Sequence, residues 1–158
     1  GSTHRFNYTM MGDNVNLAAR CESGAKSYGV YTMVTQQTKK EAEEAGDRCI
    51  FRYLDKIIVK GRSEPVEMYE IVGLRDRISP KDLECISIYE EAQQYYLNKE
   101  FKKAKTLFRQ SEVLEPRNRL SNSDINSTPS QVFIKRCQKL QQNPPDAKWN
   151  GVYIMETK

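Results

Sequence analysis

The sequence predicts an α+β fold in which strands and helices mix in the first half and helices alone follow. Hydrophobic residues alternate in short runs up to residue 74, and a helical period of apolar residues takes over after residue 82. The charged segment between them, residues 75–81, is expected to be a linker and a hinge, with Ser79-Pro80 as its stop signal. We therefore expect a sheet-and-helix domain over residues 1–74 and an α-helical hairpin extension over residues 82–158.

The first domain is expected to begin with a strand, a sharp turn and a helix. Residues 8–10 suit a half-buried strand by their alternation. Gly12 permits backbone conformations that other residues resist, and Asp13 is well placed to cap the first helical amides. A helix over residues 13–26 follows, and residues 27–29 are expected to end it.

A strand, a second helix and a hairpin complete the first domain. Residues 30–34 alternate like a strand, and Thr35 is expected to cap a charged helix over residues 36–45 that stops at a glycine. Residues 50–59 and 66–72 are then expected to form two strands joined by a short connection.

The extension is expected to hold two helices joined by a turn at residues 98–100. Small and aromatic residues in it resemble the spacing of a tetratricopeptide repeat: Ala92, Ala104 and Ser111, with Tyr95, Phe101, Phe108 and Pro116. One such unit cannot bury its own apolar face. It must therefore pack on the first domain, on the tail or on a partner chain, either as a peptide-binding module or as a plain brace.

The tail is expected to hold a loop over residues 117–130, a helix over residues 131–142 and a short extended run at the end. Pro144-Pro145 follows that helix. Trp149 is the only tryptophan of the chain. Because an indole can bury a large apolar area, we expect Trp149 to anchor the tail rather than to serve as a ligand platform.

Composition excludes several classes of function. The net charge of +4 comes from interleaved lysines and acids rather than from a basic cluster, so a nucleic-acid partner is not expected. The sequence contains no apolar run long enough to cross a bilayer, so we expect a cytoplasmic chain without direct membrane contact of its own, and anchoring of the full-length parent in a membrane stays open. The chain has four scattered cysteines and one histidine, which is not the spacing of a metal site, and the thiols are expected to be reduced.

Two blocks resemble the second half of the class III nucleotide cyclase catalytic domain. The first, residues 8–20, reads YTMMGDNVNLAAR and matches the family's pattern of an aromatic, a base-selecting residue and then Gly-x-x-Val-Asn-x-Ala-x-Arg. The second, residues 53–62, reads YLDKIIVKGR and is similar to the hairpin whose Lys-Gly turn closes that domain. The segment after residue 89 looks like the extension of bacterial cyclases, through Arg136-Cys137, Pro144-Pro145 and residues 149–152.

The resemblance implies a role for four residues. Asn16 would orient the ribose of the substrate, and Arg20 would stabilise charge on the α-phosphate during attack. Lys60 would hold the terminal phosphates, and Thr9 stands at the base-selecting position with a residue typical of adenine-preferring members. Asn16 and Arg20 stand four residues apart, so they lie on one helix face. Positioned cations are also what a phosphoryl transition state requires.

The resemblance also implies a partial ferredoxin-like cyclase domain that makes cyclic AMP and pyrophosphate from ATP as a homodimer. The family's Mg²⁺ or Mn²⁺ ions are held by carboxylates in the first half of the domain, which this chain is expected to lack. We therefore assign no metal ligand and expect the chain alone to be inactive. A guanylate cyclase is one alternative, and a helical interaction or dimerisation module of a signalling protein is another.

Overall fold

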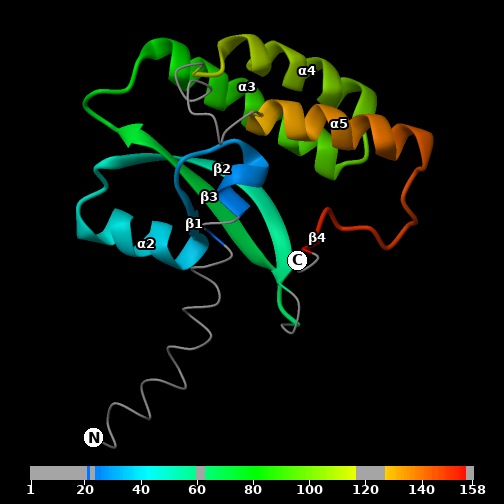
Figure 1. Cartoon of the computed structure of the whole chain (residues 1–158), viewed down its shortest axis with the longest axis horizontal. Coiled ribbons are helices and arrows are strands. Elements are labelled where there is room, and N and C mark those ends of the chain that lie inside the picture. The colour runs from blue at the N-terminus through cyan, green and yellow to red at the C-terminus, as the bar shows by residue number, and fades with distance from the viewer. Residues whose placement is uncertain (1–20, 22–23, 60–62, 117–126, 156–158) are drawn as a thin grey trace, which may run out of the picture.

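A four-stranded mixed sheet lies against three helices in the computed structural model of the chain (Figure 1). The structure describes residues 21, 24–59, 63–116 and 127–155. The helices α3, α4 and α5 gather on one side of the sheet, whereas α2 lies apart from them beside β1. The predicted mixed α+β fold is therefore confirmed at this level. The closer assignment to a ferredoxin-like cyclase domain stays a prediction.

The sheet has the strand order β1-β3-β2-β4. Its strands are β1 (Met33–Thr35), β2 (Cys49–Val59), β3 (Val66–Leu74) and β4 (Tyr153–Met155). The two long strands pair antiparallel, and β1 joins β3 in the same sense. The strand β4, which comes from the tail, runs parallel to the last residues of β2. The two ends of the described chain therefore contribute to one sheet.

Helix α2 (Gln36–Ala45) begins and ends where local signals predicted. The Thr35 hydroxyl accepts a hydrogen bond from the backbone N–H of Thr38 at 3.2 Å, which satisfies one of the first helical amides. Gly46 ends the helix and donates its N–H back to the last turn. The observed strand β1 is shorter than the strand predicted over residues 30–34 and begins later, because only Met33–Thr35 pairs with β3.

The helices α3 (Pro80–Leu97) and α4 (Phe101–Leu114) form the predicted hairpin. The expectation that Ser79-Pro80 is a stop signal is wrong. The Ser79 hydroxyl instead accepts from the N–H of Asp82 at 3.1 Å, and Pro80 opens α3. Proline is favoured in a first helical turn because the amide hydrogen it lacks would have no intrahelical acceptor there.

Helix α5 (Pro129–Gln142) begins two residues before the predicted start, because a proline again opens the helix. Thr128 caps it by accepting from the N–H of Gln131 at 3.1 Å, and Pro129 lies in its first turn. Together α3, α4 and α5 form the layer that covers the sheet (Figure 1). Among the helices described here, none is long and apolar enough to cross a bilayer.

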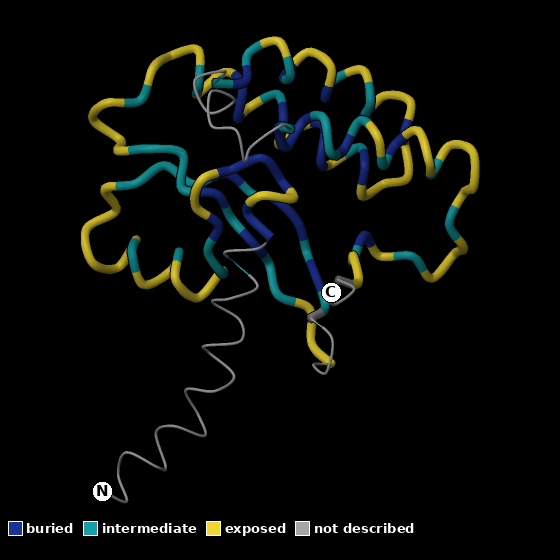
Figure 2. The backbone as a smooth tube through the Cα atoms, in the orientation of Figure 1, coloured by how far each residue is buried: buried dark blue, intermediate teal, exposed yellow. Residues whose placement is uncertain are grey.

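One hydrophobic core joins the sheet to this helical layer. Leu54, Ile57 and Met68 of the sheet are fully buried in the same cluster as a group of aromatic rings from the helices. These rings are Tyr89, Tyr96, Phe101, Phe108 and Phe133. Figure 2 shows the buried backbone concentrated where the helices face the sheet. The hairpin therefore buries its apolar face within this chain, on α5 and the sheet.

Trp149 packs between Tyr96 and Phe101, with ring centroids 5.3 and 5.5 Å away. The prediction that this tryptophan anchors the tail is confirmed. The predicted similarity of the hairpin to a tetratricopeptide repeat stays a prediction. The predicted division of the chain into two domains at residues 75–81 also stays a prediction. The four cysteines are free thiols, as expected.

Candidate functional site

The four predicted site residues, Thr9, Asn16, Arg20 and Lys60, lie outside the described residues. The structure describes the segments that flank two of them. Residues 24–28, which follow Arg20, are the end of a helix, and β2 ends at Val59, directly before Lys60. The candidate site is therefore approached through the contacts that hold these two segments.

A buried bridge made by Tyr28, Asp55 and Arg136 joins the two segments to α5. One terminal nitrogen of Arg136, Nη1, donates to Asp55 Oδ2 at 2.6 Å, and the other, Nη2, donates to the Tyr28 hydroxyl at 3.2 Å. That hydroxyl in turn donates to Asp55 Oδ2. Tyr28 lies at the end of the first helix and Asp55 lies in β2, so this Arg136 bridge connects both flanks of the predicted site.

Aromatic rings surround the guanidinium of Arg136. Its carbon lies 4.1 Å from the ring centroid of Tyr153, 4.8 Å from that of Phe133 and 5.6 Å from that of Tyr28. Tyr153 belongs to β4 and Phe133 to α5. Because the ring faces carry negative partial charge, they favour the cation and restrict its orientation. The tail strand thus helps to hold the bridge.

Burial and charge pairing act in opposite directions on the ionisable groups of the bridge. Burial raises the pKa of the Asp55 carboxyl, and the charge of Arg136 opposes that shift. Burial also works against the charge of Arg136, but Asp55 outweighs it and raises the guanidinium pKa above its ordinary value. Burial and the neighbouring Asp55 raise the pKa of Tyr28 far above its ordinary value, so the phenol remains a neutral donor.

A second buried cluster joins the two long strands to α4 and α5. Arg52 of β2 pairs with Glu70 of β3 at 2.6 Å and with Glu115, directly after α4, at 2.7 Å. The hydroxyl of Ser130 donates to Glu115 at 2.8 Å and lies 2.7 Å from that of Ser111. We call these five residues the Arg52 cluster.

The sequence reasoning missed the Arg52 cluster. A signal was present: Arg52 lies two residues before Leu54 on the same strand, so both side chains point to one face. Leu54 is fully buried, and an arginine that shares its face must find partners in the interior. The sequence places Arg136 and Asp55 only within blocks that resemble cyclases, and gives neither a role of its own.

Within the described part of the chain, no group of three or more acidic, histidine or cysteine side chains could hold a metal ion. The buried carboxylates of Asp55, Glu70 and Glu115 are engaged by arginines instead. The described geometry therefore fits a scaffold that holds the flanks of a site, and it supplies no metal centre of its own.

Comparison with known proteins adds an independent observation. No protein-family model matches the chain, and no solved structure matches it. The terminal-differentiation specific adenylate cyclase of Dictyostelium discoideum is 28% identical over 138 residues, which are 87% of this chain and 6% of the cyclase. Adenylate cyclase 1 of Rhizobium meliloti (strain 1021) is 36% identical over 74 residues, and an adenylate cyclase of Anabaena cylindrica is 33% identical over 72.

The chain covers a small share of these relatives, at most 14% of the length of each. The two bacterial matches cover 47% and 45% of this chain, and the Dictyostelium match extends over nearly all of it. The chain is therefore distantly similar to adenylate cyclases over most of its length.

Proposed function

We propose that this chain is the C-terminal part of an adenylate cyclase, which converts ATP to cyclic AMP and pyrophosphate. The observation that carries the proposal is the similarity to an adenylate cyclase over 87% of the chain. The chemistry of residues 8–20 and of the Lys-Gly turn at Lys60 agrees with it, because they pair an amide and two cations suited to phosphate oxygens.

In this proposal the chain supplies part of a composite site in a homodimer. Asn16 orients the ribose, Arg20 stabilises charge on the α-phosphate, Lys60 holds the leaving phosphates and Thr9 selects adenine. Bound Mg²⁺ or Mn²⁺ would neutralise phosphate charge, and we expect its ligands in the first half of the catalytic domain. The role of this chain is to position cations and donors where negative charge develops.

The helical extension acts as a brace in this scheme. The Arg136 bridge holds the end of the helix that follows Arg20 and the strand that precedes Lys60. Displacements of about 1 Å are enough to reduce catalysis strongly, so fixing both flanks has a direct catalytic value. A separate peptide-docking role is less well supported, because Phe133 and Trp149 already cover the inner face of the hairpin.

A complementation assay tests the proposal. The chain is incubated with ATP and either Mg²⁺ or Mn²⁺, alone and mixed with the first half of the catalytic domain. We expect cyclic AMP only from the mixture, and the Arg20→Ala variant should lower its rate by at least about a hundredfold, as expected for loss of a transition-state cation. Lys81→Ala, on the exposed surface of α3, is the control.

Cyclic AMP formed by the chain alone would contradict the proposal that the chain supplies only part of the site. Wild-type turnover in Arg20→Ala would contradict the catalytic role of Arg20. Competition between ATP and GTP in the same assay decides the base preference assigned to Thr9. Light scattering of the active mixture decides whether a dimer is the working unit.

A further inference from the structure

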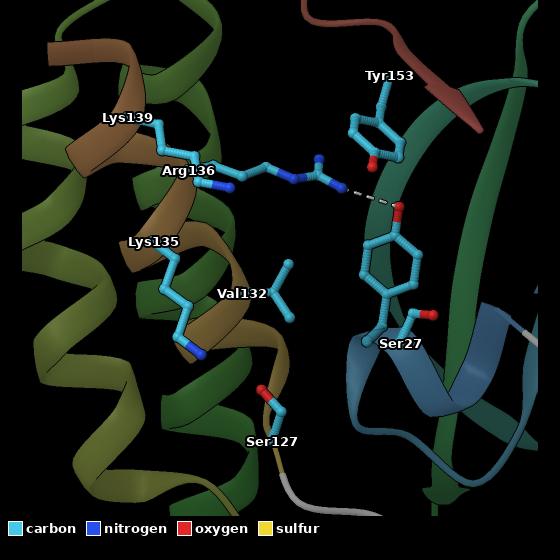
Figure 3. Close-up of a pocket in the computed structure, with 8 residues that line it drawn as sticks. Ser27, Ser127, Val132, Lys135, Arg136, Lys139 and Tyr153 are labelled. Carbon is cyan, nitrogen blue, oxygen red and sulfur yellow. Dashed lines mark hydrogen bonds between the residues drawn. The ribbon is translucent and has the colours of Figure 1, made fainter. Parts of the chain in front are cut away.

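A cavity of about 460 Å³ opens between α5, β4 and the end of the first helix (Figure 3). Three cationic side chains, Lys135, Arg136 and Lys139, approach it from α5. Ser27 faces them from the other side and Tyr153 lies beside Arg136, while Tyr28 also lines the cavity. The volume lies within the range of small-molecule sites in proteins.

The lining of this cavity is positive. No carboxylate is among the described residues that line it. Arg136 is neutralised by Asp55, which lies beneath it in β2. Neither Lys135 nor Lys139 has an ion-pair partner among the described residues.

The two lysines are exposed and lie close enough on the helix to repel each other modestly. They stand four residues apart on α5, where like charges face each other and destabilise the helix. The hydroxyl of Ser27 adds a hydrogen-bond donor to the same lining, whereas that of Ser127 donates to the carbonyl of Thr128 at 3.5 Å and can accept a hydrogen bond. Tyr153 is 46% exposed and offers an apolar ring next to these polar groups.

We infer that this cavity is a binding site for a phosphate-bearing small molecule. The two ammonium groups act as point charges for phosphate oxygens, and the Ser27 hydroxyl provides a directional hydrogen bond. The exposed ring of Tyr153 gives room for an organic group on the phosphate, which distinguishes a nucleotide from inorganic phosphate. None of the described residues that line the cavity is among those proposed for catalysis, and the binding step does not depend on the proposed function.

Occupancy of this site would also act on the Arg136 bridge. A ligand held by Lys135 and Lys139 lies against Arg136 and Tyr28, which both line the cavity. It would therefore restrict the same side chains that connect the extension to β2 and to the first helix. A bound phosphate ligand would therefore stabilise the contacts between the helical extension, β2 and the first helix.

Calorimetric titration of the chain at low ionic strength tests the inference, with inorganic phosphate, pyrophosphate and 5′-AMP as separate probes. We expect at least one probe to bind, more weakly as salt is added. The double variant Lys135→Gln/Lys139→Gln should weaken that binding by at least about tenfold. The matched control Lys81→Gln/Lys102→Gln removes two exposed charges from α3 and α4 and should leave the affinity within about twofold.

The variant Lys60→Gln separates this site from the proposed catalytic one. Binding that survives Lys60→Gln and is lost in Lys135→Gln/Lys139→Gln supports the cavity. Binding lost only in Lys60→Gln, binding unaffected by either change, or no binding of any probe would overturn the inference. Because no turnover is measured, an inactive cyclase would not change these outcomes. Preference for 5′-AMP over both inorganic probes would identify a nucleotide as the ligand class.

Discussion

Charged side chains lie buried where the sheet meets the helices. Arg52, Asp55, Glu70 and Glu115 are each at most 2% exposed. None of the described buried side-chain nitrogens and oxygens lacks a hydrogen-bond partner. A buried charge without its partner is strongly destabilising, so each of these groups requires the opposite layer to be in its native position. Their effect is to select one docking geometry.

Arg136→Met should lower the free energy of unfolding by about 3 kcal/mol, because it leaves the Asp55 carboxylate buried without its cation. Urea denaturation at neutral pH measures this. Arg75→Met is the matched control: Arg75 pairs with Asp47 at 2.9 Å, but both side chains are more than half exposed. If Arg75→Met lowered the free energy of unfolding by more than about 1 kcal/mol, or if both variants lowered it equally, burial would not be the cause of the effect.

The loss of unfolding free energy in Arg136→Met, relative to wild type, should become smaller as the pH falls. Burial already raises the pKa of Asp55, and removal of Arg136 takes away the main opposing influence. A carboxyl whose pKa is raised on folding contributes stability below its unfolded pKa and loses it as pH rises through its folded pKa. The difference from wild type should therefore be smaller at about pH 4 than at about pH 7.5, in the range above the ordinary aspartate pKa.

Adding Asp55→Asn to Arg136→Met provides the control for this pH dependence. The double variant has no carboxyl at this position, so its stability difference from Asp55→Asn alone should be independent of pH over the same range. A persistent pH dependence would show that another group is responsible.

At the scale of elements, the turn that ends the first helix decides how that helix meets α5. Gly29 has a φ of +72° and donates its N–H to the carbonyl of Lys26 at 3.1 Å. A Cβ at this position would lie 2.1 Å from the carbonyl oxygen of Ser127. The backbone of the turn therefore passes directly against the segment that leads into α5, and only glycine fits.

Gly29→Ala should lower the free energy of unfolding by at least about 2 kcal/mol, since strain from the left-handed conformation adds to a backbone clash. Gly73→Ala is the matched control, because a Cβ at Gly73 in β3 meets nothing within 4 Å. The control should change stability by no more than about 0.5 kcal/mol. Equal effects in thermal or urea unfolding would contradict the close approach at Gly29.

At the scale of the molecule, the sheet and the helices depend on one core. Leu54, Ile57 and Met68 are buried in the cluster that contains the aromatic rings of α3, α4 and α5. The Tyr89 hydroxyl also donates to the backbone carbonyl of Leu54 at 3.2 Å. The tail returns through β4 to pair with β2. We therefore expect the sheet and the helical extension to fold together.

This expectation predicts a single unfolding transition. Fluorescence of Trp149, which reports on the helical layer, should change at the same urea concentration as far-ultraviolet circular dichroism, which reports on all elements. A chain cut after residue 79 should show no cooperative transition, because the apolar face of its sheet would lose its cover. Two separated transitions, or a cooperative truncated chain, would indicate independent domains.

Local signals in the sequence determined the fold class, the bounds of α2 and the turn between α3 and α4, because caps, glycines and periodicity act over a few residues. They also identified Thr9, Asn16, Arg20 and Lys60 by a motif, and those roles stay predictions. Tertiary structure alone decided the parallel pairing of β4 with β2, the Arg52 cluster and the Arg136 bridge. Arg52 and Glu115 are 63 residues apart, and Asp55 and Arg136 are 81 apart. Contacts over such separations depend on how whole elements pack, which no local pattern records.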